Sequence, residues 1–591
     1  MSASTATAKP LNRLARYIPI LSWLPRYDRT WLRADVIAGL TLWGLVVPEA
    51  MAYAGIAGLP PQAGLYTLLA ALLIYALLGT SRHLVVQATS ATAALLASSV
   101  AAVLMGTAAV NASDPGTYQA YASAFVLVTG LVFLVAGLVK LGFITQFLSK
   151  PVMDGFVMGI AIFVAVGQLN KLFGVPKPEG NTVEKLLGIL AELPQANWAT
   201  FVVGAVALAL LFLLPRWNKK IPAGLVVLFG AIILSAVLDF EGRFGIEVVG
   251  ALPQGLPSIV LPQVPWTAYL AMVLPAIGVL LVAYSEALGV AHEFAEKHGY
   301  EVDANQELNA HAGANLVSAF FGGMLAAGSM SASAVKEGAG ARSQVTNLVA
   351  WGVTIITLLF LTPLFAPLPE AVLAALIIHA VWHIIGSRKL QKLRNESRVE
   401  VWFGVAALAG VVLVDVLQGM IIGLVASLVF VIYKTSRPHI AALGRVPGVP
   451  GAYADLARHP ENVPVPGVLI VRLDSQLYFA NALTVRDWVK AMLDEMSPPP
   501  HAVIFDAHAQ DEIDVTSTDV LRGLFKELHA RGIDVYVTHV HAPVLEHGRE
   551  TGLLAAVGED HVFATVDLAV RAAEAAAQLN PAPALPPSAG V

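Results

Sequence analysis

Long hydrophobic segments recur through most of this chain and constrain its fold more than any other feature. From about residue 34 to 434, apolar runs of roughly 17 to 24 residues follow one another, a length that crosses a bilayer as an α-helix. Only 13% of the residues are charged, whereas soluble domains contain about 25%. The sequence therefore predicts an all-α membrane domain. Its fourteen predicted helices lie at residues 34–56, 63–79, 88–106, 119–140, 152–170, 197–215, 223–239, 268–291, 309–325, 330–341, 345–366, 370–386, 399–415 and 417–434.

Basic residues predict how these helices are oriented. They cluster in the N-terminal segment 1–33 and after even-numbered helices, as at 140–150, 216–220 and 388–398. Because cytoplasmic loops carry the excess of Lys and Arg, both termini are predicted to be cytoplasmic. The connection 171–197 carries several lysines on the opposite side and is the exception.

Two weak helices at corresponding positions indicate an internal repeat. The third begins late and the tenth is short, and they start with the similar runs Thr89–Ala93 and Met330–Ala334. Interrupted helices at matching positions of two halves are typical of inverted repeats with a binding site near the bilayer midplane. We therefore expect seven helices repeated as seven. The two half-helix N-termini would attract an anion through unpaired N–H groups and a positive dipole end.

The first predicted helix carries Pro48 and Glu49 near the middle of its apolar run. An ionisable group at this depth is energetically costly and is by default a hypothesis for a functional site. The proline frees backbone groups that neighbouring helices or a lined cavity must satisfy. The alternative is a structural kink whose carboxylate pairs with another helix.

The remaining composition excludes several functions. The chain has no cysteine, which excludes disulfides and thiolate metal sites, and its net charge of −5 argues against a nucleic-acid partner. His379 and His383 have the spacing of a metal pair but lack an identifiable third ligand. No phosphate-binding GxxxxGK[ST] motif and no catalytic triad occurs, so we expect neither ATP-driven transport nor an enzyme. The sequence predicts no cofactor and no metal site.

The N-terminal segment 1–33 is basic but lacks the separate apolar core and cleavage site of a signal peptide. We interpret it as a retained cytoplasmic segment that lies near the membrane surface. The abundance of Ala, Leu, Val and Gly suits a bacterial inner membrane. The predicted transmembrane domain therefore covers residues 34–437 of a multi-pass protein.

The chain changes character after the last predicted helix. Residues 438–466 are rich in Pro and Gly and are predicted to be a linker, and residues 467–578 have the pattern of a soluble α/β domain. The tail 579–591 is rich in Pro and Ala and is predicted to be disordered. The expected strands are 467–474, 501–506 and 533–540, and the expected helices 482–496, 516–531 and 564–578.

Several long motifs resemble the sulfate permease (SulP) family of anion transporters. They occur in the family's order and are PEAMAYAGIAGLPPQAGLY with LLGTSRHL, HGYEVDANQEL, GSMSASAVKEGAGARSQ, LVDVLQGMIIG and, in the α/β domain, QLYFANA, IDVTSTDVL and LHARGIDVYV. The resemblance implies a core domain of helices 1–4 and 8–11, a gate domain of the other helices, and a C-terminal STAS domain. It places the anion between the facing starts of helices three and ten.

Carried over residue by residue, the resemblance implies a substrate site from three helices. Its members are Glu49, Tyr53, Thr89, Ser90, Ser329, Ser331 and Ala332. Serine and threonine hydroxyls can donate hydrogen bonds to an anion. The alternative is that these small side chains only allow helices to approach closely.

Two departures from the family pattern affect this site. Gln87-Ala88 stands where relatives often have Gly-Pro, and Ala332 stands where many have Arg or Lys. The missing cation makes the pocket less positive, and Lys336 lies about one turn further along the helix. The positive helix ends remain.

A second intramembrane carboxylate, Glu286, lies on helix eight beside Ser285. Buried carboxylates exchange protons near neutral pH, which favours proton symport with Glu49 as the protonated group. Oxygen ligands from Glu286 and Ser285 would instead begin a sodium site. We therefore expect a secondary anion transporter, most simply sulfate uptake by proton symport through an elevator-like movement, and a homodimer. The alternatives are proton- or sodium-coupled bicarbonate or C4-dicarboxylate transport, or an anion-sensing protein with the STAS domain as its output.

In the STAS-like domain, Thr516 occupies the position at which bacterial anti-sigma antagonists carry a phosphorylatable serine. It is therefore a candidate regulatory residue. We favour the simpler role of N-cap for the helix that follows.

Overall fold

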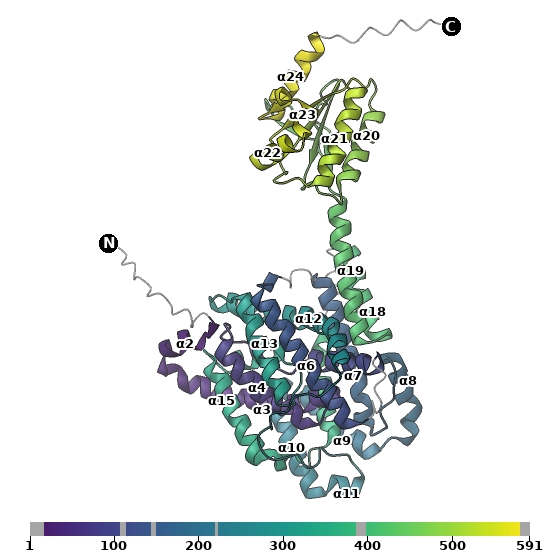
Figure 1. Cartoon of the computed structure of the whole chain (residues 1–591). Coiled ribbons are helices and arrows are strands. Elements are labelled where there is room, and N and C mark those ends of the chain that lie inside the picture. The colour runs from purple at the N-terminus through teal and green to yellow at the C-terminus, as the bar shows by residue number, and fades with distance from the viewer. Residues whose placement is uncertain (1–16, 107–113, 144–148, 219–222, 386–397, 580–591) are drawn as a thin grey trace. The chain divides into compact units, whose positions relative to one another are not determined.

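The computed structural model describes residues 17–106, 114–143, 149–218, 223–385 and 398–579. The chain separates into two compact units, with the boundary between Leu428 and Val429, and each unit is described by itself (Figure 1). The predicted tail 579–591 lies outside the described residues except for Leu579, as does most of the N-terminal segment.

The first unit is helical, and each of the fourteen predicted segments contains a helix. Eight of the described helices are long and apolar enough to cross a membrane, and four shorter ones are also apolar. The helices of the membrane domain are α2 (Ile20–Trp23), α3 (Leu32–Ile56), α4 (Pro61–Leu78), α5 (Ser90–Gly106), α6 (Pro115–Leu138), α7 (Lys150–Phe173), α8 (Thr182–Glu192), α9 (Trp198–Trp217), α10 (Ala223–Leu238), α11 (Phe240–Phe244), α12 (Trp266–His298), α13 (Ala304–Phe320), α14 (Met330–Gly338), α15 (Val345–Ile356), α16 (Glu370–Ile385), α18 (Arg398–Leu413) and α19 (Val416–Ser436).

The third and tenth segments are interrupted, as their weak hydrophobic patterns predict. Strand β1 (Val85–Gln87) precedes α5, and strand β2 (Ala327–Ser329) precedes α14. The strands pair antiparallel, with Val85 opposite Ser329 and Gln87 opposite Ala327. Extended backbone at membrane depth is tolerated here because the two strands satisfy each other's polar groups inside the protein.

The helices pack in two groups that match the predicted core and gate domains. In the core group, α13 packs on α4 and α6, α3 on α4 and α15, and α12 on α6; in the gate group, α7 packs on α16 and α18, and α16 on α9. Glycines allow the closest approaches. A Cβ atom at Gly155 of α7 would lie 2.0 Å from the carbonyl oxygen of Gly404 of α18, so the two backbones touch without a side chain between them.

The connection 171–197 has secondary structure of its own. It contains the amphipathic helix α8, which begins with a capping box. The side chain of Asn181 accepts from the backbone N–H of Glu184, and the Glu184 carboxylate accepts from the backbone N–H of Asn181. Such reciprocal capping stabilises a helix too short to span a membrane.

The second unit is an α/β domain built on a six-stranded sheet. Its strand order is β4-β3-β5-β6-β7-β8, with β5 to β8 parallel. Helix α24 packs on one face of the sheet, and α20, α21 and α23 contribute to the apolar cluster on the other. The elements are β3 (Ile440–Arg445), β4 (Tyr453–Asp455), β5 (Val468–Leu473), α20 (Ala482–Glu495), β6 (Ala502–Asp506), α21 (Val515–Ala530), β7 (Asp534–Thr538), α22 (Ala542–Glu550), α23 (Leu553–Val557), β8 (Val562–Phe563) and α24 (Val566–Leu579).

The prediction of a linker at 438–466 was wrong for its strand-forming part. Strand β3 pairs with β5 from Ile440 opposite Leu473, and β4 extends the sheet beyond β3. The Pro- and Gly-rich composition concealed a short alternating pattern in which Ala441 and Leu443 face the core.

Candidate functional site

The starts of α5 and α14 are held together by the β1–β2 ladder. Because the strands run antiparallel, α5 and α14 begin at opposite ends of the ladder. The Thr89 hydroxyl accepts a hydrogen bond from the N–H of Thr92 at 3.2 Å, and the Ser329 hydroxyl accepts one from the N–H of Ala332 at 3.3 Å. The remaining N–H groups of both first turns make this region favourable for an anion.

The side chain of Gln87 connects this ladder to the first helix. Its Nε2 donates to Oε2 of Glu49 at 3.0 Å and lies 3.4 Å from Oγ of Ser329. Its Oε1 is buried without a hydrogen-bond partner. Gln87 is therefore a candidate site residue that the sequence reasoning did not select, although its departure from the family pattern was a usable signal.

Tyr53 lies near both of the predicted intramembrane carboxylates. Tyr53, 5% exposed on α3, is within electrostatic range of both Glu49 and Glu286. Ser285 donates its hydroxyl proton to the backbone carbonyl of Leu281 on its own helix. The structure thus brings Glu49, Tyr53 and Glu286 together from α3 and α12.

The tenth-helix residues divide into two kinds. Ser331 is exposed, with its Oγ 3.2 Å from Oγ of Ser329, whereas Ala332 is fully buried in the core cluster. Lys336 is also fully buried, and its Nζ donates to Oδ1 of Asn347 on α15 at 3.0 Å. This bond holds the Lys336 ammonium group against α15. At the third-helix start, Thr89 and Ser90 are both half-buried.

Lysines from the unexpected basic connection line a cavity beside the end of α3. The cavity has a volume of about 70 Å³ and is lined by Gly55, Lys171, Lys177 and Lys185. Lys171 forms an ion pair with Glu370 at 2.9 Å. Burial, and then the charge of Lys171, lower the pKa of Lys177 from its ordinary value. A bound anion would relieve this repulsion.

A hydrogen-bonded pair joins a core helix to a gate helix. Ser98 of α5 donates to Oδ2 of Asp415 at 2.6 Å and accepts from the N–H of Leu417 at 3.1 Å. Ser98 is 5% exposed. Asp415 directly precedes α19 of the gate group. Its carboxylate is thus bonded to a helix of the core group across the boundary between the two groups.

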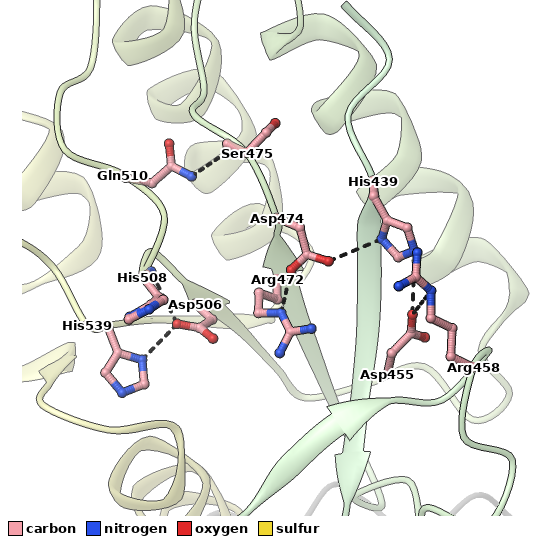
Figure 2. Close-up of polar contacts among 10 residues, drawn as sticks. All are labelled: His439, Asp455, Arg458, Arg472, Asp474, Ser475, Asp506, His508, Gln510 and His539. Atoms are coloured by element: carbon pink, nitrogen blue, oxygen red, sulfur yellow. Dashed lines mark hydrogen bonds and ion pairs between the residues drawn. The ribbon is translucent and has the colours of Figure 1, made fainter. Parts of the chain in front are cut away.

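The STAS-like unit carries polar residues at the carboxyl ends of its parallel strands (Figure 2). Oδ1 of Asp506, at the end of β6, lies 2.8 Å from Nδ1 of His539. The side chain of Gln510 donates to the backbone carbonyl of Ser475 at 2.9 Å. An apolar cavity of about 110 Å³ lies beneath these residues and is lined by Val471, Phe505 and other apolar side chains.

The prediction that Thr516 caps the following helix was wrong. Helix α21 begins at Val515, and its N-cap is Asp514, whose side chain accepts from the N–H of Ser517 at 2.9 Å. A carboxylate two residues earlier satisfies the free N–H group and suits the positive helix end. Thr516 is exposed in the first turn, so its regulatory role stays a prediction.

No three histidine or acidic side chains converge as a metal site within the described part of the chain. The ring of His379 packs on Phe212, with centroids 4.7 Å apart. The side chain of His383 lies outside the described residues.

Comparison with known proteins decides the family. The model of the sulfate permease family matches residues 32–407, and that of the STAS domain matches residues 459–569. The chain belongs to the sulfate permease family. A probable sulfate transporter of Mycobacterium tuberculosis (strain CDC 1551 / Oshkosh) is 34% identical over 95% of this chain and 99% of that protein. Human solute carrier family 26 member 6 is 33% identical over 82% of this chain and 66% of that protein.

Solved structures agree with this assignment. Murine solute carrier 26 family member A9, an anion transporter in the inward-facing state, superposes with a TM-score of 0.87 and 25% identity over 97% of this chain and 96% of that chain. The transmembrane domain of a cyanobacterium bicarbonate transporter shares the fold, with a TM-score of 0.58 and 23% identity over 68% of this chain and 98% of that chain. This sulfate permease family member is thus a multi-pass membrane protein with a C-terminal STAS domain, and its family transports anions and does not comprise enzymes.

Proposed function

We propose that this protein takes up sulfate, or a similar inorganic anion, by proton symport. The names of its relatives support sulfate as the substrate. The observation that carries the proposal is the contact of Gln87 with both Glu49 and Ser329, because it joins a carboxylate to the start of a half-helix. An anion near this helix start would meet the charge of Glu49 unless that carboxylate is protonated.

The amide of Gln87 would link protonation of Glu49 to binding of the anion. While Glu49 is ionised, its oxygen accepts from the Gln87 amide. A protonated Glu49 becomes a donor, for which the unpartnered Oε1 of Gln87 is an acceptor. Rotation of the amide would then release its NH₂ group toward an anion at the α5 and α14 starts, with Ser331 as a further donor. Proton and anion binding would favour each other.

Transport would follow from movement of the core group of helices past the gate group. The separate packing of these groups supports an elevator-like movement. The bond between Ser98 and Asp415 crosses their boundary and would break and reform in each cycle. The positive-inside pattern supports cytoplasmic termini in a bacterial inner membrane, and we propose a homodimer as the assembled form.

Uptake into proteoliposomes tests the proposal. Labelled sulfate, bicarbonate and fumarate would be offered under an imposed pH gradient, a sodium gradient or neither. We expect sulfate uptake that an inward proton gradient drives and a sodium gradient does not. Sodium-driven uptake would move coupling to Glu286 and Ser285, and preferential bicarbonate or fumarate uptake would overturn the substrate.

The variant Glu49→Gln tests the coupling residue. A glutamine cannot exchange a proton, so uptake should lose its response to the pH gradient while sulfate binding stays measurable. Glu293→Gln, an exposed position on α12, is the matched control and should behave like the unmodified protein. An unchanged pH response in Glu49→Gln would assign coupling elsewhere.

A further inference from the structure

A polar cavity lies at the end of the membrane domain where the N-terminal segment packs, away from the predicted transport site. Its volume is about 380 Å³. It is formed by the segment from Pro19 to Trp31, the connection after α4, the connection between α12 and α13, and the connection between α14 and α15. Four stretches that are distant in sequence thus meet around one space.

Three arginines line this cavity: Arg26, Arg82 and Arg342. Within the described part of the chain, none of the three forms an ion pair. The guanidinium of Arg82 lies over the ring of Tyr300, 5.4 Å from its centroid. The acidic side chain on the lining is Glu301, and Asp28 is close enough to Arg342 to interact with it electrostatically. The side chains that line the cavity thus include three cations and one carboxylate, Glu301.

Aromatic and hydroxyl side chains complete the lining. Trp23, Tyr27 and Ser343 lie beside the arginines. An anion with several oxygen atoms would pair with the three arginines together, since guanidinium groups match phosphate oxygens in geometry and charge.

The cavity is held in shape by the buried carboxylate of Asp35. Its Oδ1 accepts from the N–H of Arg342 at 2.7 Å, and its Oδ2 accepts from the hydroxyls of Ser343 at 2.7 Å and Tyr27 at 3.0 Å. These bonds tie the N-terminal segment and the connection before α15 to α3. The Asp35 carboxylate thereby bonds the backbone N–H of Arg342 and not its guanidinium.

The flank of the cavity suits a membrane surface. Leu21, Leu24 and Leu32 of the N-terminal segment are each 47% to 48% exposed. Apolar side chains beside aromatic and basic residues are typical of a segment that lies in the headgroup region of a bilayer.

From these observations we propose that the cavity lined by Arg26, Arg82 and Arg342 binds a phosphate group, as carried by an anionic lipid headgroup or by a soluble phosphate. The ligand would fasten the N-terminal segment to the connections before β1 and α15. The first connection leads into β1 and α5, and the second follows α14. Since α5 and α14 start at the predicted transport site, bound phosphate would stabilise the core group. The proposal does not depend on which anion the protein transports.

The full-length protein in nanodiscs tests this site. One arm compares the thermal midpoint in pure phosphatidylcholine with that in phosphatidylcholine containing phosphatidylglycerol. A second arm titrates inorganic phosphate into the pure phosphatidylcholine nanodiscs. Both arms are repeated with Arg82→Gln, Arg342→Gln and Arg33→Gln. Arg33 is exposed in the first turn of α3 and does not line the cavity, so it controls for general loss of a basic charge.

We expect the thermal midpoint to rise in at least one arm. Each cavity variant should require a roughly fivefold higher concentration of lipid or phosphate for the same rise, because one basic side chain near anionic headgroups contributes this much affinity. Arg33→Gln should keep the response of the unmodified protein. A response confined to the first arm assigns the site to a lipid, and one confined to the second assigns it to soluble phosphate. No rise in either arm, or an equal loss in Arg33→Gln, would overturn the proposal.

Discussion

The amide nitrogen of Gln87 lies 3.0 Å from the Glu49 carboxylate and 3.4 Å from the Ser329 hydroxyl. One neutral side chain therefore stands where the first helix, the third and the tenth come together. Many relatives are expected to carry a cation after the serine at position 331, and this chain has Ala332 there, fully buried. In the proposed site, the polar groups available to an anion are thus the helix ends, Ser331 and the amide of Gln87.

Replacing Gln87 by alanine should weaken anion transport through the loss of this bridge. A hydrogen bond to a charged group contributes about 1.5 to 3 kcal/mol, so we expect the KM for sulfate to rise roughly tenfold or more. The response of uptake to pH should also shift, because Glu49 loses its donor. Labelled uptake at several pH values measures both effects. Gln119→Ala on α6 is the control, and equal behaviour of the two variants would contradict the role of Gln87.

The lysine-lined cavity should attract anions to the end of α3. Lys177→Gln combined with Lys185→Gln should raise the KM for sulfate at low ionic strength and have little effect at high salt, since screening removes long-range attraction. Uptake measured across a salt series tests this. Arg243→Gln, exposed in α11, removes a charge elsewhere on the same predicted side. A change in KM that does not depend on salt would show that these lysines do not act by attraction.

Ser98→Ala should loosen the boundary between core and gate. It leaves Asp415 without its hydroxyl donor, which costs about 1 to 3 kcal/mol in a buried site. The unmodified protein has no cysteine, so a single Ser331→Cys probe reports access to the site through its labelling rate. We expect that rate to change in Ser98→Ala. The control is Ser99→Ala, which removes a buried hydroxyl that has no partner and should leave labelling unchanged.

His83, in the connection after α4, should make the thermal stability of the protein depend on pH. Burial, followed by the charges of Lys336 and His298, lowers the pKa of His83 from 6.5 to about 4. The folded state disfavours the charged ring, so the contribution of His83 to the free energy of unfolding is complete above pH 6.5. This contribution is lost as the pH falls toward about 4. Thermal midpoints across this range should fall less steeply in His83→Gln than in the unmodified protein. His292→Gln, exposed on α12, should keep the original slope.

The sequence predicted the elements that hydrophobic length and periodicity control. All fourteen membrane segments contain a helix, and β5, β6 and β7 agree with the predicted strands to within two residues. The interruption of the third and tenth segments followed from their polar starts. These features are local, so a run of residues is sufficient to recognise them.

The missed features depend on contacts between distant residues. Strand β3 was hidden in the supposed linker because its pairing with β5 comes from tertiary structure. The Asn181 capping box turns part of a lysine-rich connection into α8, and Asp514 displaces Thr516 as the cap of α21. Gln87 was seen only as a departure from a pattern, because its role needs Glu49 and Ser329 beside it. Pairing partners of this kind are set by the fold and leave no periodic signal.

The β1–β2 ladder also constrains the order in which the protein can be made. Val85 leaves the ribosome long before Ser329, its partner in the ladder. Until β2 arrives, the polar backbone of β1 has no strand to pair with and cannot be left in contact with lipid. The first half of the membrane domain is therefore incomplete as a membrane structure, and we expect the binding site to close only after the tenth helix has been inserted. The two halves of the repeat would then mature together, as a single late event of assembly.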